Sequence, residues 1–378
     1  MIRIIHKAIR LYNKRALSYY EAKDKRINRK ILVIESDDWG SIRVPSLEVK
    51  KHLIKQGYNL DTRVFARCDT LESNYDIEAL YDVLSNYKDI NGHPPIITAN
   101  SVVANPNFSK IKDSGFSTYF FEPSSETYLS YPDCERSLNL LKKGEELGYI
   151  CIQSHGREHI NYQYWLKLLR SGNEDVRIAF DMGMCWLFPK TQPTMPNPVV
   201  SAYEYASKEE KSDLLNSISM GLSMFERQFG HKSCTFVAPC FIWSDAIEEV
   251  LRNHGVIMIQ SDRIQKDHTI HSKRDRVHYM GEKNRFGQVY SIRNCIFEPA
   301  INRDGKEMER CLAQVSQAFE TDRIAVISSH RINYVGGIIP ENRTSTLNQL
   351  KVLLDMIIKK YPDVEFMSSP MVFESFFD

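Results

Sequence analysis

Three apolar segments that lie far apart in the sequence each end in ionisable side chains. The first leads into Asp37 and Asp38, the second into His155 and His159, and the third into His330. Short apolar runs of this kind are typical of buried strands. The carboxyl ends of parallel strands meet at one end of an α/β barrel, where such barrels assemble their active sites. The pattern therefore predicts that these five side chains lie together.

The residue types suit a divalent metal ion. Two imidazoles and one carboxylate leave open coordination positions, and a further carboxylate and imidazole remain for acid–base chemistry. A spacing of four places His155 and His159 on one side of a helical turn, as two ligands of one ion require. The alternative for this pair is two histidines with ordinary polar partners at the start of a helix. For His330 the alternative is a buried structural histidine.

The adjacent aspartates constrain the backbone that carries them. Asp37 and Asp38 point to opposite faces if a strand continues through them. If the chain turns instead, with Gly40 supplying the conformational freedom, one carboxylate can bind the ion while the other lies beside it. The alternative is that both aspartates only form a turn and cap a helix.

Strand-like and helix-like segments alternate along the chain, which predicts an α/β fold with a parallel sheet and helices outside it. The predicted strands are 31–36, 96–99, 149–154, 236–239, 256–260, 323–329 and 364–368. The predicted helices are 46–57, 75–88, 134–147, 160–171, 206–228, 244–253, 306–320 and 345–360. Residues 177–203 read as a long loop. We expect one barrel domain over residues 31–378, with an N-terminal extension over 1–30 and an insertion around 262–290.

The composition of the chain bears on its binding partners and on the cellular compartment in which it works. The net charge of +1 gives no field that would attract nucleic acid. None of the eight cysteines forms a CxxC pair, which favours reduced thiols in a cytoplasmic protein. No stretch of 18 apolar residues exists to cross a membrane. The basic, amphipathic helix predicted near the N-terminus could rest on the inner membrane surface, or it could pack on the outside of the barrel.

The motifs resemble those of the polysaccharide deacetylases, the NodB-homology family also called carbohydrate esterase family 4. Glu35-Ser36-Asp37-Asp38-Trp39-Gly40 resembles the first motif, Thr-Phe-Asp-Asp-Gly. His155-Gly156-Arg157-Glu158-His159 resembles the second, with Gly156 in place of a hydroxyl residue. Val237-Ala238-Pro239-Cys240-Phe241 loosely resembles the third, and Ile327-Ser328-Ser329-His330 resembles the last. The family fold is a distorted parallel (β/α) barrel with fewer than the usual eight strands, so the resemblance implies about seven here.

The resemblance also implies residue roles. Asp38, His155 and His159 would bind a divalent ion, with zinc expected and cobalt, nickel or iron as alternatives. Asp37 would act as general base, and His330 would protonate the leaving group. A backbone N–H near Cys240 would help to hold the oxyanion. The implied activity is metal-dependent removal of an acetyl group, by amide or ester cleavage, from a sugar, a polysaccharide or a lipid-linked precursor.

Several positions depart from the family pattern. The arginine that orients the catalytic aspartate in the third motif is Val237 here, and Arg157 or Arg331 could replace it. Cys240 stands where an aromatic residue usually lines the sugar groove, and the nearby Phe241 and Trp243 could substitute for it. The inserted Trp39 is a further candidate for contact with substrate.

Two alternative functions stay open. One is a glycosidase that uses paired carboxylates, with Glu35, Glu122, Asp181 and Glu298 as candidates. The other is a non-catalytic carbohydrate-binding protein on a decayed deacetylase barrel, which the missing third-motif arginine favours.

Overall fold

The computed structural model describes residues 17–190, 199–269 and 272–378. Parallel strands lie side by side in the order β10, β7, β6, β5, β2, β1, β12 and β11. Their bounds are β1 (Ile31–Trp39), β2 (Ile97–Ser101), β5 (Ile150–Ser154), β6 (Thr235–Val237), β7 (Met258–Ser261), β10 (Val289–Ile292), β11 (Cys295–Ile296) and β12 (Ala325–His330). A short strand, β13 (Glu365–Phe366), pairs with the start of β1.

The two ends of this path belong to one extended segment. Strands β10 and β11 are separated only by Arg293 and Asn294. The Arg293 N–H donates to Ser261 O of β7 over 2.9 Å, and the Asn294 N–H donates to Val326 O of β12 over 3.1 Å. The sheet therefore closes into a barrel, in which β10 and β11 are two halves of one extended strand. This confirms the predicted distorted parallel (β/α) barrel of about seven strands.

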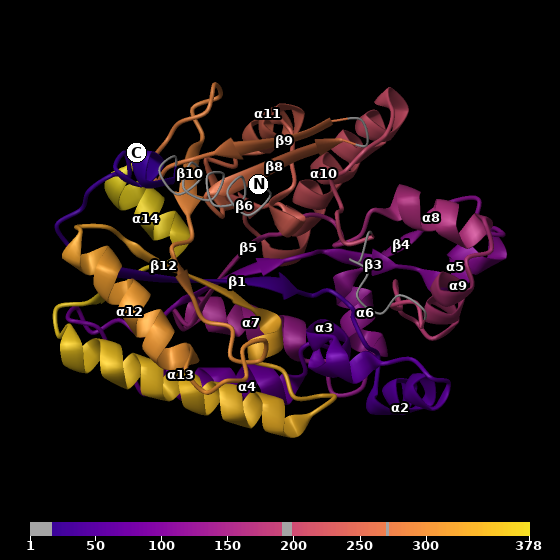
Figure 1. Cartoon of the computed structure of the whole chain (residues 1–378), viewed down its shortest axis with the longest axis horizontal. Coiled ribbons are helices and arrows are strands. Elements are labelled where there is room, and N and C mark those ends of the chain that lie inside the picture. The colour runs from indigo at the N-terminus through magenta and orange to yellow at the C-terminus, as the bar shows by residue number, and fades with distance from the viewer. Residues whose placement is uncertain (1–16, 191–198, 270–271) are drawn as a thin grey trace, which may run out of the picture.

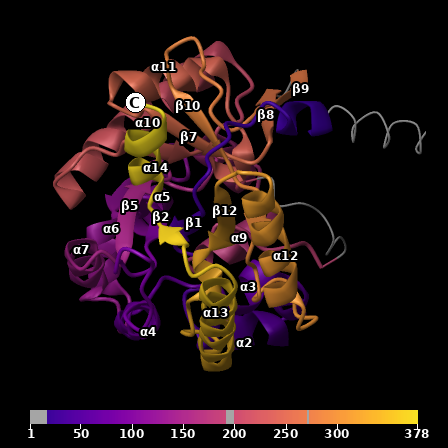
Figure 2. The same cartoon turned by 90° about the vertical axis from the view of Figure 1, so that its left-hand side faces the viewer.

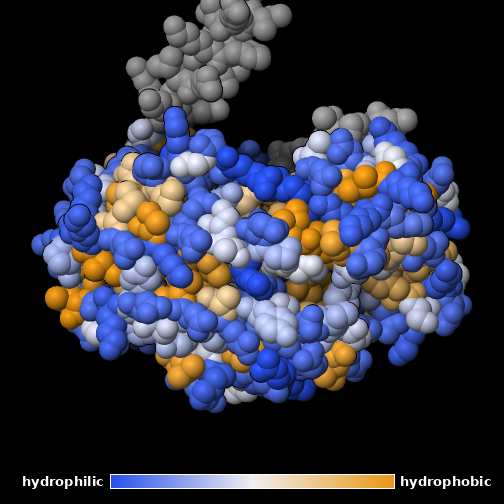
Figure 3. Space-filling model, turned by 90° about the horizontal axis from the view of Figure 1, so that it is seen from below, coloured by the Kyte–Doolittle hydropathy of each residue, from blue (hydrophilic) through white to orange (hydrophobic). Residues whose placement is uncertain are grey.

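Helices cover the outside of the barrel (Figures 1 and 2). They are α4 (Asn74–Leu84), α7 (Ser137–Glu146), α10 (Lys208–Phe229), α11 (Asp245–Asn253), α12 (Glu307–Glu320), α13 (Pro340–Lys360) and α14 (Ser369–Phe376). Local signals explain their bounds: a capping box between Ser73 and Asp76 begins α4, and Gly230 in the left-handed conformation ends α10. The face seen from below is mostly hydrophilic, with hydrophobic residues in separate patches (Figure 3).

Alternation along β1 decides which residues face the barrel interior. Leu32 and Ile34 pack in the apolar cluster that includes residues of α4, α12 and α13, whereas Ile31 and Val33 pack in a second cluster with α14. Glu35 and Asp37 share the register of Ile31 and Val33, because side chains on a strand alternate with a period of two. Their carboxylates therefore point into the barrel.

The remaining elements lie in the connections between strands. Several gather on the right-hand side of Figure 1. The connecting elements are α2 (Leu47–Lys55), η1 (Leu60–Thr62), α3 (Val64–Cys68), β3 (Ala104–Pro106), α5 (Phe108–Asp113), β4 (Phe121–Pro123), α6 (Ser124–Ser130), α8 (Tyr162–Arg170), α9 (Glu174–Asp181), η2 (Pro239–Phe241), β8 (Ile264–Thr269), β9 (Ser272–Val277) and η3 (Arg331–Asn333). The predicted loop over 177–203 is wrong at its start, because α9 continues to Asp181.

The predicted insertion at 262–290 contains the antiparallel β8–β9 hairpin, which lies outside the barrel sheet. The last two residues of the predicted insertion, Val289 and Tyr290, instead begin β10, a barrel strand that was not predicted from the sequence. The N-terminal extension predicted over 1–30 lies partly outside the described residues. Its described part is helical only over 17–21. Among the helices that the structure describes, none is long and apolar enough to cross a membrane.

Candidate active site

Strand β1 is distorted where the two aspartates stand. Its pairing with β2 shifts register between Ser36 and Trp39, and Asp38 has a φ of +76°. Non-glycine residues adopt this left-handed conformation rarely, and often at functional sites. The distortion breaks the strict alternation, so both carboxylates reach the same cavity at the carboxyl end of β1.

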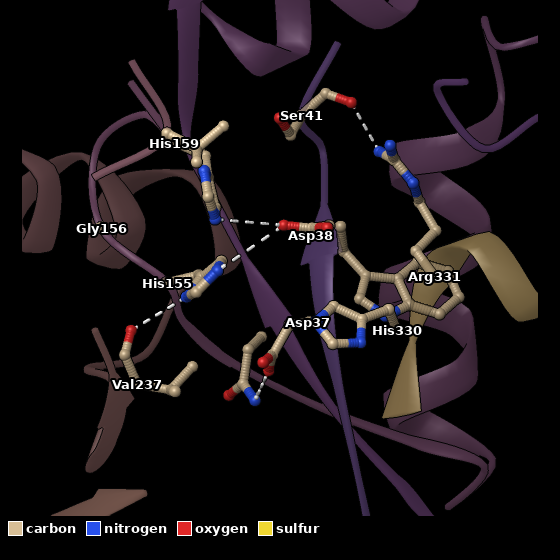
Figure 4. A network of polar contacts seen from close by, with 12 residues as sticks. Asp37, Asp38, Ser41, His155, Gly156, His159, Val237, His330 and Arg331 are labelled. Atoms are coloured by element: carbon tan, nitrogen blue, oxygen red, sulfur yellow. Dashed lines mark hydrogen bonds and ion pairs between the residues drawn. The ribbon is translucent and has the colours of Figure 1, made fainter. Parts of the chain in front are cut away.

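Both histidines of the second motif converge on Asp38 (Figure 4). Asp38 Oδ1 lies 3.4 Å from His159 Nε2 and 3.7 Å from His155 Nε2. His155 directly follows β5, but residues 155–161 form a loop and no helical turn, so the expected helical placement is wrong. The left-handed conformation of Gly156, with a φ of +99°, turns the chain here instead. The loop still brings the two rings to one point.

These three side chains can hold a divalent ion. Ligand atoms about 2.0–2.2 Å from a tetrahedral zinc ion lie about 3.4 Å from one another, close to the spacing of Asp38 Oδ1 from the two Nε2 atoms. Asp38 Oδ1 is buried between the two imidazoles and the guanidinium group of Arg43. The His155 Nδ1 lies 2.9 Å from Val237 O, and an Nδ1–H donated to that carbonyl leaves the Nε2 lone pair available. Burial lowers the pKa of His159 to about 3, which keeps its imidazole neutral as a ligand must be.

A cationic group beside Asp38, the guanidinium of Arg43, was not predicted. Arg43 Nη2 lies 3.0 Å from Asp38 Oδ1, and Arg43 Nε lies 3.3 Å from Asp69 Oδ2. Burial alone would raise the pKa of Asp38. Arg43 and the neighbouring His159 outweigh it and hold that pKa well below its usual range. An isolated arginine in a loop after a strand carries no sequence signal of such a contact.

Arg293 orients Asp37. Its Nη1 and Nη2 donate to the two oxygens of Asp37 over 2.6 and 2.7 Å, and its Nε donates to Glu35 Oε2 over 2.6 Å. Asn100 Nδ2 donates to Asp37 Oδ1 over 2.8 Å and to Gln260 Oε1 over 2.7 Å. Burial opposes ionisation of Asp37, but Arg293 outweighs it and holds the pKa of the carboxyl below its usual range. Asp37 is therefore ionised at neutral pH.

The two arginines proposed for this task lie elsewhere. Arg331 is fully buried, donates to Asp69 and Glu72 over 3.0 Å each, and donates to Ser41 O. His330, the last residue of β12, lines the cavity, whereas Arg331 begins η3 and is enclosed by the carboxylates of Asp69 and Glu72. The β-branched and aromatic residues of Val289-Tyr290-Ser291-Ile292, directly before Arg293, were the signal that could have predicted this strand and its arginine.

Arg157 is also buried, and it faces away from the cavity. It forms a bidentate ion pair with Glu158 and lies over the ring of Phe121, 4.4 Å from the ring centroid. The prediction that Arg157 or Arg331 orients Asp37 is therefore wrong, and neither side chain lines the cavity that holds Asp37 and Asp38.

The predicted substrate contact of Trp39 is wrong as well. Its side chain is 1% exposed, its Nε1 donates to Ser36 Oγ over 2.9 Å, and its ring stacks on Tyr334. The β1 distortion points this indole into the core. Cys240 and Phe241 do line the cavity, and each has a φ of +56°.

His330 is paired with a buried carboxylate. Its Nδ1 lies 2.5 Å from Glu298 Oε1, and Asn333 Nδ2 donates to Glu298 Oε2 over 2.8 Å. Burial opposes protonation of His330, but Glu298 outweighs it and raises the pKa of the imidazole to about 10. His330 is therefore cationic at neutral pH and can donate a proton from Nε2.

We predict that Glu298→Gln lowers the pKa of His330. The raised pKa means that the Glu298–His330 pair stabilises the fold fully below the unfolded pKa of about 6.5, and that this contribution is lost as the pH rises through about 10. The difference in the free energy of unfolding between wild type and variant should thus be large at pH 6 and shrink towards pH 10. Urea titrations of the chelated proteins measure it, and a pH-independent difference would contradict the pairing.

The side chain of Tyr203 explains why residue 156 is a glycine. A Cβ at position 156 would lie 2.1 Å from the Tyr203 hydroxyl oxygen, which is buried and has no hydrogen-bond partner within the described ranges. The hydroxyl that the family carries on the residue after the first histidine is thus excluded at this position. The ring of Tyr203 stacks on Phe236 of the barrel, so it cannot easily move away.

We predict that Gly156→Ser destabilises the protein by about 3 kcal/mol, from left-handed strain and the clash together. The matched control is Gly172→Ser: Gly172 has a φ of +76° but open space around it, so we expect a loss of only about 1 kcal/mol. Tyr203→Phe in the Gly156→Ser background should recover part of the difference. Equal losses at both glycines in urea titrations would contradict the clash.

The residues described so far enclose one cavity with a volume of about 380 Å³. Asp37, Asp38, His155, His159 and His330 all line it, so the structure brings together the five side chains that the apolar runs singled out. None of the four carboxylates proposed for a glycosidase lines it. Glu35 and Glu298 lie behind Asp37 and His330, Asp181 is exposed and pairs with Lys112, and Glu122 lines a separate cavity.

Comparison with solved structures gives distant similarities. A 4-alpha-glucanotransferase from Thermococcus litoralis is 11% identical, with 94% of this chain and 41% of that chain covered and a TM-score of 0.44. The Xyl-CE4 domain of a multidomain xylanase from the hindgut metagenome of Trinervitermes trinervoides is 9% identical, with 92% and 91% covered and a TM-score of 0.39. An allantoinase is 9% identical, with 93% and 92% covered and a TM-score of 0.45. The chain thus spans less than half the length of the glucanotransferase.

No curated protein sequence matches the chain. One family model does, over residues 59–295, which is more than half of the sequence. The match includes His155, His159 and Arg293, and it excludes Asp37, Asp38 and His330. The family is one of carbohydrate-acting enzymes, but it is not the deacetylase family whose motifs the sequence resembles. The chain belongs to glycosyl hydrolase family 57.

Proposed function

We propose that this protein is a metal-dependent hydrolase that removes an acetyl group, N- or O-linked, from a sugar. The observation that supports this most is the convergence of Asp38 Oδ1 and the Nε2 atoms of His155 and His159 in one cavity with Asp37 and His330. The ion that we propose is zinc, with cobalt, nickel or iron as alternatives for the same ligands.

A bound divalent ion would lower the pKa of water towards about 7 and polarise the acyl carbonyl. The side chains of the protein supply the proton transfers. Asp37, kept ionised and oriented by Arg293, accepts a proton from the attacking water. His330, kept cationic by Glu298, donates a proton to the leaving nitrogen or oxygen. The water oxygen bonds to the acyl carbon, the bond to the sugar nitrogen or oxygen breaks, and acetate and the free amine or alcohol leave.

The backbone around Cys240 is proposed to hold the oxyanion. Cys240 and Phe241 are both left-handed and both line the cavity, and strained backbone of this kind persists where the surrounding structure imposes it. A backbone N–H turned towards the cavity there would stabilise the negative charge that develops on the acyl oxygen.

The substrate class that we propose is a glycan or a glycan precursor, including a lipid-linked sugar. A cytoplasmic location is part of this proposal, because all eight cysteines are free thiols, as a reducing compartment favours. The missing arginine at position 237 favoured a non-catalytic binding protein, and the contact of Arg293 with Asp37 removes that support.

Acetate release from a panel of N- and O-acetylated sugars tests the proposal. We expect the purified protein to contain close to one equivalent of a divalent metal, and we expect acetate release to stop on chelation and to return with zinc. The measurements are elemental analysis and an acetate assay before and after dialysis against a chelator. Acetate release that is unaffected by complete removal of metal would refute the metal-dependent mechanism.

The family match favours a second candidate, hydrolysis or transfer at a glycosidic bond. The carboxylates that line the cavity are Asp37, Asp38 and Glu158, and the family name implies this chemistry. Such a reaction needs one carboxyl group that stays protonated as the acid, whereas Asp37 and Asp38 both have pKa values held low by arginines. Cleavage of oligosaccharides that survives chelation would favour this candidate over deacetylation.

A further inference from the structure

Most of the cavity wall beside the five polar side chains is made of hydrocarbon. Its members come from separate segments: the loop after β1, helix α3, the segments that follow α9, and the turn after β11. The apolar wall is formed by Val44, Phe65, Met184, Phe188, Val200 and Ile301. Such a surface gains free energy when it is covered by an apolar group.

The apolar wall is held in place from behind. Val44 and Met184 belong to one buried apolar cluster with Leu53 and Leu187, and both are at most 4% exposed. Phe188 packs against a second cluster that contains Trp165 and lies 4.1 Å, centroid to guanidinium carbon, from Arg63. These three members of the wall are in place before a ligand arrives, so binding against them costs little ordering.

Several polar side chains around the cavity already have partners. Asn105 Nδ2 donates to Gly40 O, and Asn105 Oδ1 accepts from the Ile42 N–H over 3.0 Å. Glu158 accepts two hydrogen bonds from Arg157. A sugar hydroxyl placed against the apolar wall would lose its water partners without gaining protein ones, which is unfavourable. Trp186 Nε1, a buried donor of the lining, has no hydrogen-bond partner within the described ranges, and the same holds for Asp38 Oδ1, Arg43 Nε and His159 Nδ1 at the polar side of the cavity.

We propose that the substrate carries an alkyl chain of several carbons that lies against the apolar wall. The inference rests on the proposed deacetylation in this cavity, and it extends that function to longer acyl groups if the chain is part of the acyl group. The chain is either the acyl group itself, longer than acetyl, or an alkyl aglycone on the sugar. The cavity of about 380 Å³ lies in the range that holds a whole small ligand, of which an acetyl group fills only a small part.

Two substrate series test the proposal with the zinc-loaded full chain. In the first, glucosamine carries N-acyl groups from acetyl to octanoyl. In the second, N-acetylglucosamine carries alkyl aglycones of the same lengths. We expect kcat/KM to rise about fourfold per methylene in one series until the wall is covered, since each buried methylene contributes about that factor. A rise in the first series assigns the acyl group, and a rise in the second assigns the aglycone. Flat or falling values in both overturn the proposal.

Two matched variants locate the chain. Ile301→Trp fills part of the wall and should shift the preferred chain to shorter lengths. Ile296→Trp is the control, because Ile296 is 48% exposed and does not line the cavity. Phe188→Ala should flatten the length dependence. An unchanged preference in both Ile301→Trp and Phe188→Ala would contradict the placement on this wall.

Binding of alkyl hydroxamates, measured by calorimetry, distinguishes a failure of the proposed metal-dependent hydrolysis from a failure of the alkyl-chain proposal. Hydroxamates bind through the metal, so absence of binding by acetohydroxamate, together with absence of acetate release, would overturn the proposed function itself. Binding of acetohydroxamate with acetate release, but without tighter binding of longer hydroxamates or faster cleavage in either series, would overturn only the alkyl chain.

Discussion

Asp38→Asn is expected to lower the zinc content of the purified protein to background and to reduce acetate release at least about 10³-fold in kcat/KM, a loss of about 4 kcal/mol of transition-state stabilisation. The amide keeps the size of the side chain but loses the negative charge that offsets a divalent ion. Asp38 Oδ1 faces both Nε2 atoms, so the remaining imidazoles would have no third ligand among the residues that line this cavity.

Elemental analysis and the acetate assay measure both effects on one preparation. Asp181→Asn is the matched control, because Asp181 is an exposed aspartate that pairs with the likewise exposed Lys112 and does not line the cavity. The control should keep full metal content and activity. Retention of both by Asp38→Asn as well would show that the three side chains do not form a metal centre.

Arg293→Met is the second substitution with a large expected effect. It leaves Glu35 and Asp37 as two buried carboxylates without their cation, so we expect a loss of about 3–5 kcal/mol in the free energy of unfolding. Because Asp37 would no longer be held ionised and oriented, kcat should fall by about 10²- to 10⁴-fold in whatever protein remains folded. Urea titrations and the acetate assay measure the two effects separately.

Two further variants show which effect comes from which contact. Glu35→Gln in the Arg293→Met background removes one of the two buried charges, so it should restore part of the stability but none of the activity. Arg29→Met removes a half-exposed ion pair with Glu365 and should cost no more than about 1 kcal/mol. Equal stability of Arg293→Met and Arg29→Met would mean that the buried network contributes nothing.

Much of the fold was predictable because its signals are local. Each strand or helix predicted within the described residues corresponds to an observed element, usually with bounds within a few residues, whereas the predicted N-terminal amphipathic helix lies outside them. The strand β10–β11 was not predicted, because the charged segment before it resembles one long insertion. For the same reason the contact of Arg293 with Asp37 was not predicted. The helical turn predicted for His155 and His159 failed for a local reason too, since the left-handed Gly156 interrupts any helix there.

The pairing of buried charges could not be read from the same patterns. By residue type alone, Arg293 cannot be distinguished from Arg157 and Arg331, the two arginines that were the candidates for orienting Asp37. Which arginine contacts Asp37 depends on which strands of the barrel face one another across its interior. The bonds from Arg293 to Asp37 join residues 256 positions apart, and the bond from Asn100 to Gln260 crosses between strands that are not neighbours in the sheet.

The sequence by itself determined the elements of this protein and the ends of strands that carry ionisable groups, because periodicity, capping and apolar runs act over a few residues. Only the tertiary structure decided that Arg293 holds Asp37, that Glu298 holds His330, that Trp39 is buried and that an apolar wall lies beside the imidazoles. Each of these depends on barrel closure, which brings distant segments together in a space where an unpaired charge is costly and a paired one is kept.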